Sequence, residues 1–457
     1  MGFMDDKYLL QTDSAIELYS HIKELPIIDL HSHADIEEII LNKRWNDIWE
    51  VEAATDHYVW ELMRKRGIDE EKITGKEKNR EKWYALAGIF PEFAGNPTYE
   101  WIHLDLKRRF KIDMQISMNT ADKIWEKTKE KLKRDKMKPQ NVLKDMNVEV
   151  LCTTDDPTSS LKYHKRAKKE INTPKIFPTW RPDKAMKIEN NLWKDFILEL
   201  GEKTKEDTSQ LANLLKALKK THDYFDKHGC ISSDHGMYEP YTHPVEENEV
   251  NNIYKKAYQG KKLSVNEIIN YKAFLMLKFG KWNMERGWLT QFHLGTVRDY
   301  RDKLYKMVGP DSGGDISIQN IDFAHNLKNF LNEFDGSLEI VLYCLDPSHY
   351  PTIASIARAF PNVSIGAPWW FNDSPFGIEM QLKYICTVDL LSNYAGMVSD
   401  SRKLISYGSR IEVFRRTLCN VIGEMVEKGQ IPEDIAKQMV INISYNRPKQ
   451  LIKNKNK

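Results

Sequence analysis

The sequence predicts an α/β protein built as a closed (β/α)₈ barrel, the TIM-barrel architecture, with a large helical insertion after strand 1 and further helical insertions. Eight short apolar runs rich in β-branched residues alternate with helix-like sequence, which implies parallel strands in a closed barrel. The length of 457 residues suits an elaborated barrel, and 41% hydrophobic residues can fill a large core. Polar and aromatic residues gather where the runs end, which is where such barrels carry their chemistry.

The expected strands are short runs bounded by polar or turn-forming sequence. In chain order they lie at Ile27–His31, Val148–Thr153, Lys175–Trp180, Gly229–Asp234, Trp288–Leu294, Leu338–Leu345, Val363–Pro368 and Tyr394–Ser399. Helix-like sequence follows most of them, for example at Tyr350–Phe360 and Ile411–Val426.

The spacing of these runs is uneven, which indicates insertions. Residues 35–147 separate the first two runs, are rich in Trp, Lys and Glu, and are expected to form a helical insertion subdomain packed over the barrel. Further helical insertions are expected at Pro182–His228 and Glu246–Arg286. Because the sequence has no internal repeat, low-complexity tract or flexible linker, residues 1–457 are predicted to form one barrel domain.

The charge and cysteine content argue against several kinds of partner. There are 68 basic and 66 acidic residues, so the net charge of +2 creates no strong field for nucleic acid or an anionic membrane. No apolar run is long enough to span a bilayer, and the N-terminal MGFMDDKYLL lacks a signal pattern. The five cysteines are scattered without a CxxC pair. We therefore expect a cytoplasmic protein with reduced, mostly buried thiols, and the helical insertions make a homo-oligomer plausible.

The segment PIIDLHSHAD, residues 26–35, ends the first expected strand with two histidines. Residues i and i+2 of a strand point to the same face, so His31 and His33 aim two imidazoles at one place. Such a pair is a metal-ligand arrangement when a third ligand arrives from elsewhere in the fold. The alternative is a pair of hydrogen-bonded histidines at a strand end.

The ends of the later strands carry the other candidate site residues. They are Thr154-Asp155-Asp156, Trp180-Arg181, Asp234-His235, His293, Trp369-Trp370, and Asp400 with Arg402. A His-x-His after the first strand together with an aspartate after the last resembles the layout of the amidohydrolase superfamily. Strands one and eight are neighbours in a closed barrel, so Asp400 could meet His31 and His33 around one divalent ion.

Longer stretches narrow the resemblance, because the chain resembles the uronate (glucuronate) isomerase family along nearly its whole length. The matching stretches are DHYVWELMRKRGID (56–69), AGNPTYEWIHLDLKRRF (94–110), TWRPDKA (179–185), HGCISSDHG (228–236), GWLTQFHLGTVRD (287–299), LYCLDP (342–347), APWWFND (367–373) and 390–432. The chain departs from many relatives around Tyr407–Val413, where GSRIEV stands in place of an Arg-His-Glu-Tyr block.

The resemblance implies interconversion of D-glucuronate with D-fructuronate and of D-galacturonate with D-tagaturonate, by proton transfer between C2 and C1 through an enediol. It implies that His31, His33 and Asp400 bind one divalent metal ion, with zinc expected and manganese or iron as alternatives. Asp400 is also expected to act as the base. Arg402 is expected to contact the enediol oxygens or the acid end of the substrate, and Arg181 is the second candidate for the substrate carboxylate.

The family also implies roles for residues outside this group. Tyr58 is expected to shuttle a proton between O1 and O2, while His57 contacts substrate hydroxyls. His293 could bind the metal ion, or it could instead support a metal ligand or contact the substrate. Trp369 and Trp370 are expected to form an apolar wall beside the sugar, with packing at the barrel rim as the alternative. Asp234 and His235 could contact substrate or be structural.

Two other functions compete with the isomerase. A mononuclear metal-dependent hydrolase of the same superfamily would use the same ligands. A two-metal hydrolase usually needs a bridging carboxylated lysine on the fourth strand, but GCISSDH has none. A catalytically inactive binding module is the third hypothesis, against which the intact His31, His33, Asp400 and Arg402 argue.

Overall fold

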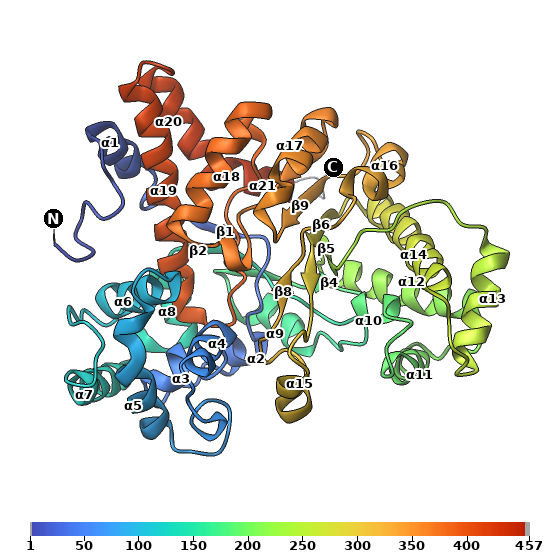
Figure 1. Ribbon diagram of the computed structural model, residues 1–457, viewed down its shortest axis with the longest axis horizontal. Helices are drawn as coiled ribbons and strands as arrows, with labels where there is room; N and C mark the ends of the chain where they lie inside the picture. The colour runs from blue at the N-terminus through green and yellow to red at the C-terminus, as the bar shows by residue number, and fades with distance from the viewer. Residues whose placement is uncertain (1, 453–457) are drawn as a thin grey trace.

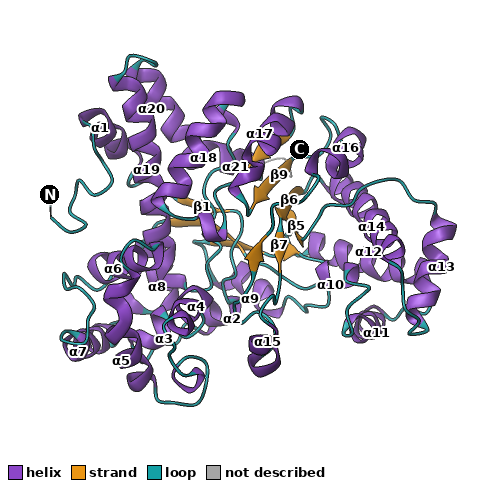
Figure 2. Ribbon diagram, viewed as in Figure 1, coloured by secondary structure: helices purple, strands orange, loops and turns teal. Residues whose placement is uncertain are grey.

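The computed structural model describes residues 2–452 as parallel β-sheets with helices packed around their outer side (Figure 2). One sheet has the strand order β1-β2-β3, and the other has the order β10-β9-β6-β5-β4. The strands are β1 (Ile27–Asp29), β2 (Val148–Cys152), β3 (Lys175–Phe177), β4 (Thr179–Trp180), β5 (Ser232–Met237), β6 (Leu289–Leu294), β9 (Ile340–Cys344) and β10 (Val363–Ile365). All pairs within these two sheets are parallel, so the predicted mixed α/β fold with parallel strands is confirmed.

The expected strand at Lys175–Trp180 is divided between the two sheets. Pro178 has no N–H to donate to a ladder, and the chain passes from β3 to β4 at this residue. Hydrogen bonds still join the sheets here, because the Asp155 amide donates to the Thr179 carbonyl at 3.0 Å and the Arg181 amide donates to the Asp155 carbonyl at 3.0 Å. Asp155 and Trp180 form an isolated parallel bridge.

The expected strand at Tyr394–Ser399 is wrong, because the structure has no strand there. Single hydrogen bonds hold this segment instead. The Ala395 amide donates to the Ile365 carbonyl at 2.9 Å, and the Asp400 amide donates to the His31 carbonyl at 3.2 Å. Gly396 interrupts a regular ladder, since its φ is +87° and a Cβ at this residue would lie 2.9 Å from Cγ of Pro448. The segment therefore connects β10 to the end of β1 without forming a strand.

Two further differences concern strand boundaries. The strand expected at Gly229–Asp234 begins later, at Ser232, because Gly229 (φ +93°) and Cys230 still belong to the turn that ends the preceding helix. An antiparallel pair, β7 (Thr296–Val297) and β8 (Ile316–Ser317), was not expected from the sequence. Each of these strands has two residues, too few to show a periodic pattern.

Helices occupy the long segments between strands. Between β1 and β2 lie α2 (Ile36–Leu41), α3 (Ile48–Glu52), α4 (His57–Lys65), α5 (Asn79–Ile89), α6 (Pro97–Arg108), α7 (Ala121–Leu132) and α8 (Pro139–Asp145). In Figure 1 these helices, blue to teal, gather on one side below the sheets. The segment expected to be a helical insertion is therefore helical.

The remaining helices follow the later strands. They are α9 (Lys162–Glu170), α10 (Asp183–Met186), α11 (Trp193–Thr204), α12 (Leu211–Lys227), α13 (Glu247–Tyr258), α14 (Val265–Arg286), α15 (Asp302–Val308), α16 (Phe323–Glu333), α17 (Tyr350–Ala359), α18 (Pro375–Val388), α19 (Tyr407–Glu427), α20 (Glu433–Ile441) and α21 (Arg447–Leu451). Single helical turns add η1 (Glu70–Lys72), η2 (Phe90–Phe93), η3 (Asp135–Met137), η4 (Pro347–His349), η5 (Trp370–Asn372), η6 (Leu391–Asn393), η7 (Leu404–Ser406) and the π-helical η8 (Asn442–Asn446).

The N-terminal helix α1 (Asp13–Ile22) packs closely on α19. At Gly423 a Cβ would lie 2.6 Å from the backbone nitrogen of Ala15, so only glycine allows this approach. Among residues 2–452, no helix is both long and apolar enough to cross a membrane. Four of the five cysteines are buried and Cys386 is exposed, which agrees with the expected mostly buried thiols.

Candidate metal centre and active site

The end of β1 is fixed beside the segment that carries Asp400. Asp29, the last residue of β1, is fully buried and accepts hydrogen bonds from the Ser399 amide at 3.0 Å and the Ser399 hydroxyl at 2.5 Å. Burial raises the pKa of Asp29 to about 6, and the Ser399 hydrogen bonds oppose this rise. Together with the backbone bond from the Asp400 amide to the His31 carbonyl, these contacts hold Asp400 against His31.

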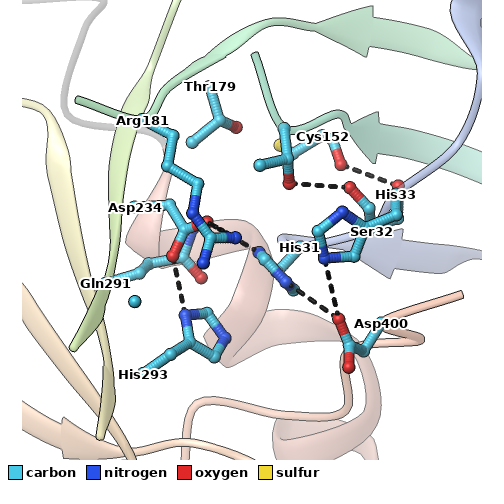
Figure 3. Close-up of polar contacts among 12 residues, drawn as sticks. His31, Ser32, His33, Cys152, Thr179, Arg181, Asp234, Gln291, His293 and Asp400 are labelled. Carbon is cyan, nitrogen blue, oxygen red and sulfur yellow. Dashed lines mark hydrogen bonds and ion pairs between the residues drawn. The ribbon is translucent and has the colours of Figure 1, made fainter. Parts of the chain in front are cut away.

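Two histidines meet Asp400 at this point (Figure 3). Asp400 Oδ1 lies 3.0 Å from Nε2 of His31 and 3.3 Å from Nε2 of His33. The other oxygen, Oδ2, accepts a hydrogen bond from Nε1 of Trp369 at 2.9 Å. Although burial would raise the pKa of Asp400, its hydrogen bonds with His31 and His33 hold that pKa well below the usual range. Asp400 is therefore a carboxylate.

The donor atoms of His31, His33 and Asp400 fit a divalent metal ion. One ligand atom from each residue lies within 4.8 Å of the other two. Burial lowers the pKa of His33, which favours the neutral imidazole that a metal ion requires. Two imidazole nitrogens and one carboxylate oxygen are a ligand set suited to zinc and also found with iron or manganese. The structure thus brings together the three residues expected to bind a metal.

Nδ1 of His31 faces a second cluster, formed by Asp234, His293 and the positively charged Arg181. Asp234 Oδ1 lies 2.6 Å from Nδ1 of His293, and Asp234 Oδ2 lies 3.4 Å from Nδ1 of His31. The guanidinium of Arg181 lies 3.0 Å from the same Oδ2. His31, Asp234 and His293 have a spacing that could hold a metal ion, but Arg181 already balances the carboxylate. Asp234 thus lies between the guanidinium of Arg181 and the imidazoles of His31 and His293.

His293 is enclosed by aromatic rings. Its ring stacks on Tyr343 with centroids 4.5 Å apart and meets the edge of Trp369 at 4.8 Å. Its Nε2 is buried and has no hydrogen-bond partner among the residues the structure describes. Burial, and secondarily the charge of His31, lowers the pKa of His293 to about 4, so this imidazole is neutral.

Helix α4 brings His57 and Tyr58 to the site from the segment between β1 and β2. Asp56 caps this helix by accepting a hydrogen bond from the Tyr58 amide at 3.0 Å. The Tyr58 hydroxyl is buried and has no hydrogen-bond partner within residues 2–452. Burial, followed by the negative charge of Asp400, raises the pKa of Tyr58 well above its usual value, so the phenol keeps its proton. Burial and the nearby Arg402 lower the pKa of His57 to about 3.

Arginines and tryptophans lie around Asp400 and His57. An Nη1–H of Arg402 donates to the Asp311 carbonyl at 3.3 Å. The rings of Trp369 and Trp370 lie 5.5 Å apart, and the Trp370 ring lies 5.5 Å from His57. The guanidinium of Arg298 lies 4.5 Å from the centroid of Trp370.

Two predicted residues have surroundings that suit a structural position. Arg181 pairs with Asp183 at 2.7 Å as well as with Asp234, so its guanidinium is engaged by two carboxylates of the protein. His235 contacts the Ser233 hydroxyl at 3.0 Å and stacks on Phe279, with its ring in the packing between β5 and α14. Burial lowers the pKa of His235 to about 4.

Sequence reasoning missed Arg298 and Asp311 and gave little weight to Asp234. Arg298 lies in GWLTQFHLGTVRD, one of the stretches that resemble the family, and this resemblance was the only signal for it. Asp311 belongs to the connection between β7 and β8, whose path the sequence does not reveal.

Comparison with known proteins identifies the family of this chain. Residues 1–452 match the family model described as glucuronate isomerase. A uronate isomerase of Thermotoga neapolitana is 59% identical over 449 residues, which cover 98% of this chain and 99% of that protein. The chain belongs to the glucuronate isomerase family. The predicted resemblance to this family, and with it the predicted enzyme class of aldose–ketose isomerase, is confirmed.

Solved structures of glucuronate isomerase family members have the same fold. The crystal structure of uronate isomerase from Thermotoga maritima superposes with a TM-score of 0.97 at 57% identity, covering 99% of this chain and all of that one. The glucuronate isomerase of Caulobacter crescentus gives a TM-score of 0.95 at 25% identity, covering 100% of this chain and 98% of that one. The arrangement of elements described above is therefore the one found in these relatives.

Proposed function

We propose that this protein interconverts D-glucuronate with D-fructuronate, and D-galacturonate with D-tagaturonate. The observation that carries the proposal is Asp400, a buried carboxylate 3.0 Å and 3.3 Å from two histidines in a chain of the glucuronate isomerase family. The names of the relatives, uronate isomerases over nearly their whole lengths, support the substrate class. We infer a cytoplasmic enzyme acting on a small hexuronate, with no nucleic-acid or membrane partner.

We also propose the finer architecture. The parallel strands, together with residues 394–400, would close into a (β/α)₈ barrel, supported by the hydrogen bonds that join Ala395 to Ile365 and Asp400 to His31. Residues 35–147 would form the helical insertion subdomain over its active-site end, supported by the position of Tyr58. The site would then lie at the carboxyl ends of the strands, as in other barrels of this type.

His31, His33 and Asp400 would hold one divalent ion, zinc as the first choice and manganese or iron as alternatives. Such an ion would stabilise negative charge that develops on substrate oxygens. Asp234 would orient His31 through its Nδ1, and His293 would complete this support without being a ligand.

The proton transfers would fall to Asp400 and Tyr58. Asp400 is ionised and would take the proton from C2 of the open-chain aldose and return it to C1, leaving an enediol between the two steps. Tyr58 is protonated and its hydroxyl has no hydrogen-bond partner among residues 2–452, so it would donate its proton to O1 as Asp400 takes the proton of C2, which gives the enediol. In the second step the Tyr58 phenolate would take the proton of O2 as Asp400 returns its proton to C1. The product is a ketose with no net gain or loss of protons.

The substrate would be held by the groups at the outer part of the site. Arg402 would bind the enediol oxygens or the acid end of the substrate, and Arg298, which pairs with one carboxylate, Asp315, at 2.9 Å, offers a second guanidinium close to Trp370. His57 would contact substrate hydroxyls, and Trp369 and Trp370 would border the sugar. Arg181 fits this role less well, because two carboxylates already occupy its guanidinium.

An isomerase assay tests the proposal against the hydrolase. Purified protein loaded with zinc is incubated with D-glucuronate in D₂O and followed by NMR. We expect signals of the ketose, with deuterium next to the carbonyl if the intermediate exchanges with solvent. Absence of ketose from both hexuronates would reject the isomerase and leave the mononuclear hydrolase, which esters and amides of sugar acids would then test.

A further inference from the structure

Lys403 is a buried cation three residues beyond Asp400. Its side chain is 1% exposed, and Nζ lies 3.1 Å from Oε2 of Glu52 and 3.1 Å from Oδ2 of Asp56. Glu52 ends α3, and Asp56 precedes α4. An ammonium group this deeply buried requires such carboxylate partners, because desolvating it alone is costly. Lys403 therefore links the Asp400 segment to the first turn of α4.

The carboxylate that binds Lys403 also positions Tyr58. Asp56 uses Oδ2 for Lys403 and Oδ1 for the Tyr58 amide, at 3.0 Å. One rigid carboxylate thus joins the lysine to the residue that carries the phenol. No hydrogen bond from residues 2–452 restrains the Tyr58 hydroxyl itself, so the position of the phenol depends on the backbone at the start of α4 and on the groups packed against the ring.

The segment from Asp400 to Lys403 is itself held as one unit. The Ser401 hydroxyl accepts a hydrogen bond from the Lys403 amide at 3.1 Å and donates to the Lys403 carbonyl at 3.0 Å. The Ser401 carbonyl accepts from the His33 amide at 3.1 Å. A shift of Lys403 would therefore also move Asp400 and His33, and a shift of either of these would move Lys403.

We propose that Lys403 is a positioning residue that sets the distance between the Tyr58 phenol and the Asp400 carboxylate through the N-cap Asp56. This inference deepens the proposed isomerase and depends on it. A misplacement of about 1 Å between two groups that act on one substrate can reduce turnover about 10²-fold. The ion pair is thus part of how the site is assembled, beyond its contribution to folding.

The second side of the phenol is held by another buried cation. The guanidinium of Arg410 lies 5.0 Å from the Tyr58 ring and 3.8 Å from the Trp101 ring, and it pairs with Asp373 at 2.8 Å. Arg410 fixes the plane of the ring, whereas Lys403 fixes the backbone from which the ring projects. The two contacts are separate, so removing Lys403 leaves Arg410 in place.

A double-mutant cycle tests the proposal. Lys403→Met keeps the length and apolar stem of the side chain and removes the ammonium group. We expect kcat with D-glucuronate to fall about 10²-fold while KM changes by less than about threefold. In the background of Tyr58→Phe, the same substitution should change kcat by less than about twofold, because the group that it positions is already absent. A similar loss in both backgrounds would mean a purely structural role and would overturn the proposal.

Two further variants keep the test decisive. Arg416→Met is the matched control. Arg416 is a buried arginine of α19 whose Nε lies 2.9 Å from Glu412, away from α4. We expect this variant to lose stability with an unchanged kcat. If Lys403→Met does not fold, Asp56→Asn replaces it in the same cycle. The amide oxygen of the asparagine can still accept from the Tyr58 amide, while the ion pair between residue 56 and Lys403 is lost. An unchanged kcat for the folded variant would also overturn the proposal. A wild-type enzyme that makes no ketose would instead reject the isomerase itself.

Discussion

Replacing Asp400 by asparagine tests the centre of the proposed mechanism with little disturbance of the backbone. Asp400 has φ +47°, in the left-handed region, where asparagine is tolerated as well as aspartate. An amide keeps one acceptor oxygen but places an NH₂ group against either Trp369 or His31, both of which contact the carboxylate now. Losing one such buried hydrogen bond costs about 1–3 kcal/mol of the free energy of unfolding. The fold should therefore survive.

The expected loss of activity is much larger. A general base contributes about 10²–10⁴-fold to a rate, which corresponds to about 3–5 kcal/mol of transition-state stabilisation. The assay measures ketose formation from D-glucuronate, with elemental analysis of each preparation so that lost metal and lost base are separated. Asp346→Asn is the control, because Asp346 also follows a strand but its carboxylate only accepts hydrogen bonds from the Ser348 amide at 2.9 Å and the Ser317 hydroxyl at 3.3 Å. Turnover of Asp400→Asn near that of the wild type would refute the role given to this carboxylate.

Three other predictions address the surroundings of the site. Tyr58→Phe should lower kcat about 10²-fold with little change in KM, and urea unfolding should show equal or greater stability, since the buried hydroxyl has no partner within residues 2–452. Burial raises the pKa of Glu61 to about 7, so the folded state binds a proton more tightly than the unfolded state and this group lowers stability as pH rises from about 4.5 to about 7. The Glu61→Gln side chain can still accept a hydrogen bond from the Gly314 amide. In urea unfolding, the free energy of unfolding of this variant minus that of the wild type should therefore be larger at about pH 8 than at about pH 5. An equal difference at both pH values would contradict the prediction. Removing the metal ion with a chelator should lower the free energy of unfolding by about 3 kcal/mol, and adding zinc should restore it. The same chelator should change the thermal unfolding of Asp400→Asn by less than that of the wild type.

The sequence predicted that His31, His33 and Asp400 lie together, from one local pattern and from the expected barrel order, and the structure places them side by side. His31 and His33 share a face at the end of a strand, and Asp400 lies where a barrel would bring the last segment beside the first. The parallel pairing of the strands was also predictable from the alternation of apolar runs and helices. The division of the expected strand at Pro178 and the loss of regular pairing at Gly396 could not be predicted. A run of β-branched residues is compatible with a strand even where the hydrogen bonds to its neighbour are interrupted.

The contacts that depend on three-dimensional packing could not be predicted. Arg181 was expected to bind substrate, but its position between Asp183 and Asp234 depends on how β4 lies against β5. The link from Lys403 to Asp56 spans the fold and has no sequence pattern. Tyr58 was placed at the site by family resemblance, because a tyrosine in a helix more often serves packing.

The guanidinium of Arg181 at the floor of the site has a consequence for the life of the enzyme. A metal pocket that loses its ion usually leaves carboxylates that repel one another and push the ligands apart. In this protein a permanent positive charge, the guanidinium of Arg181, lies 3.0 Å from Asp234 Oδ2, and Nδ1 of His31 lies 3.4 Å from the same oxygen. We therefore expect Asp234 to stay neutralised, with His31 close to it, when the proposed ion is absent, so that an ion could enter without a rearrangement of these residues.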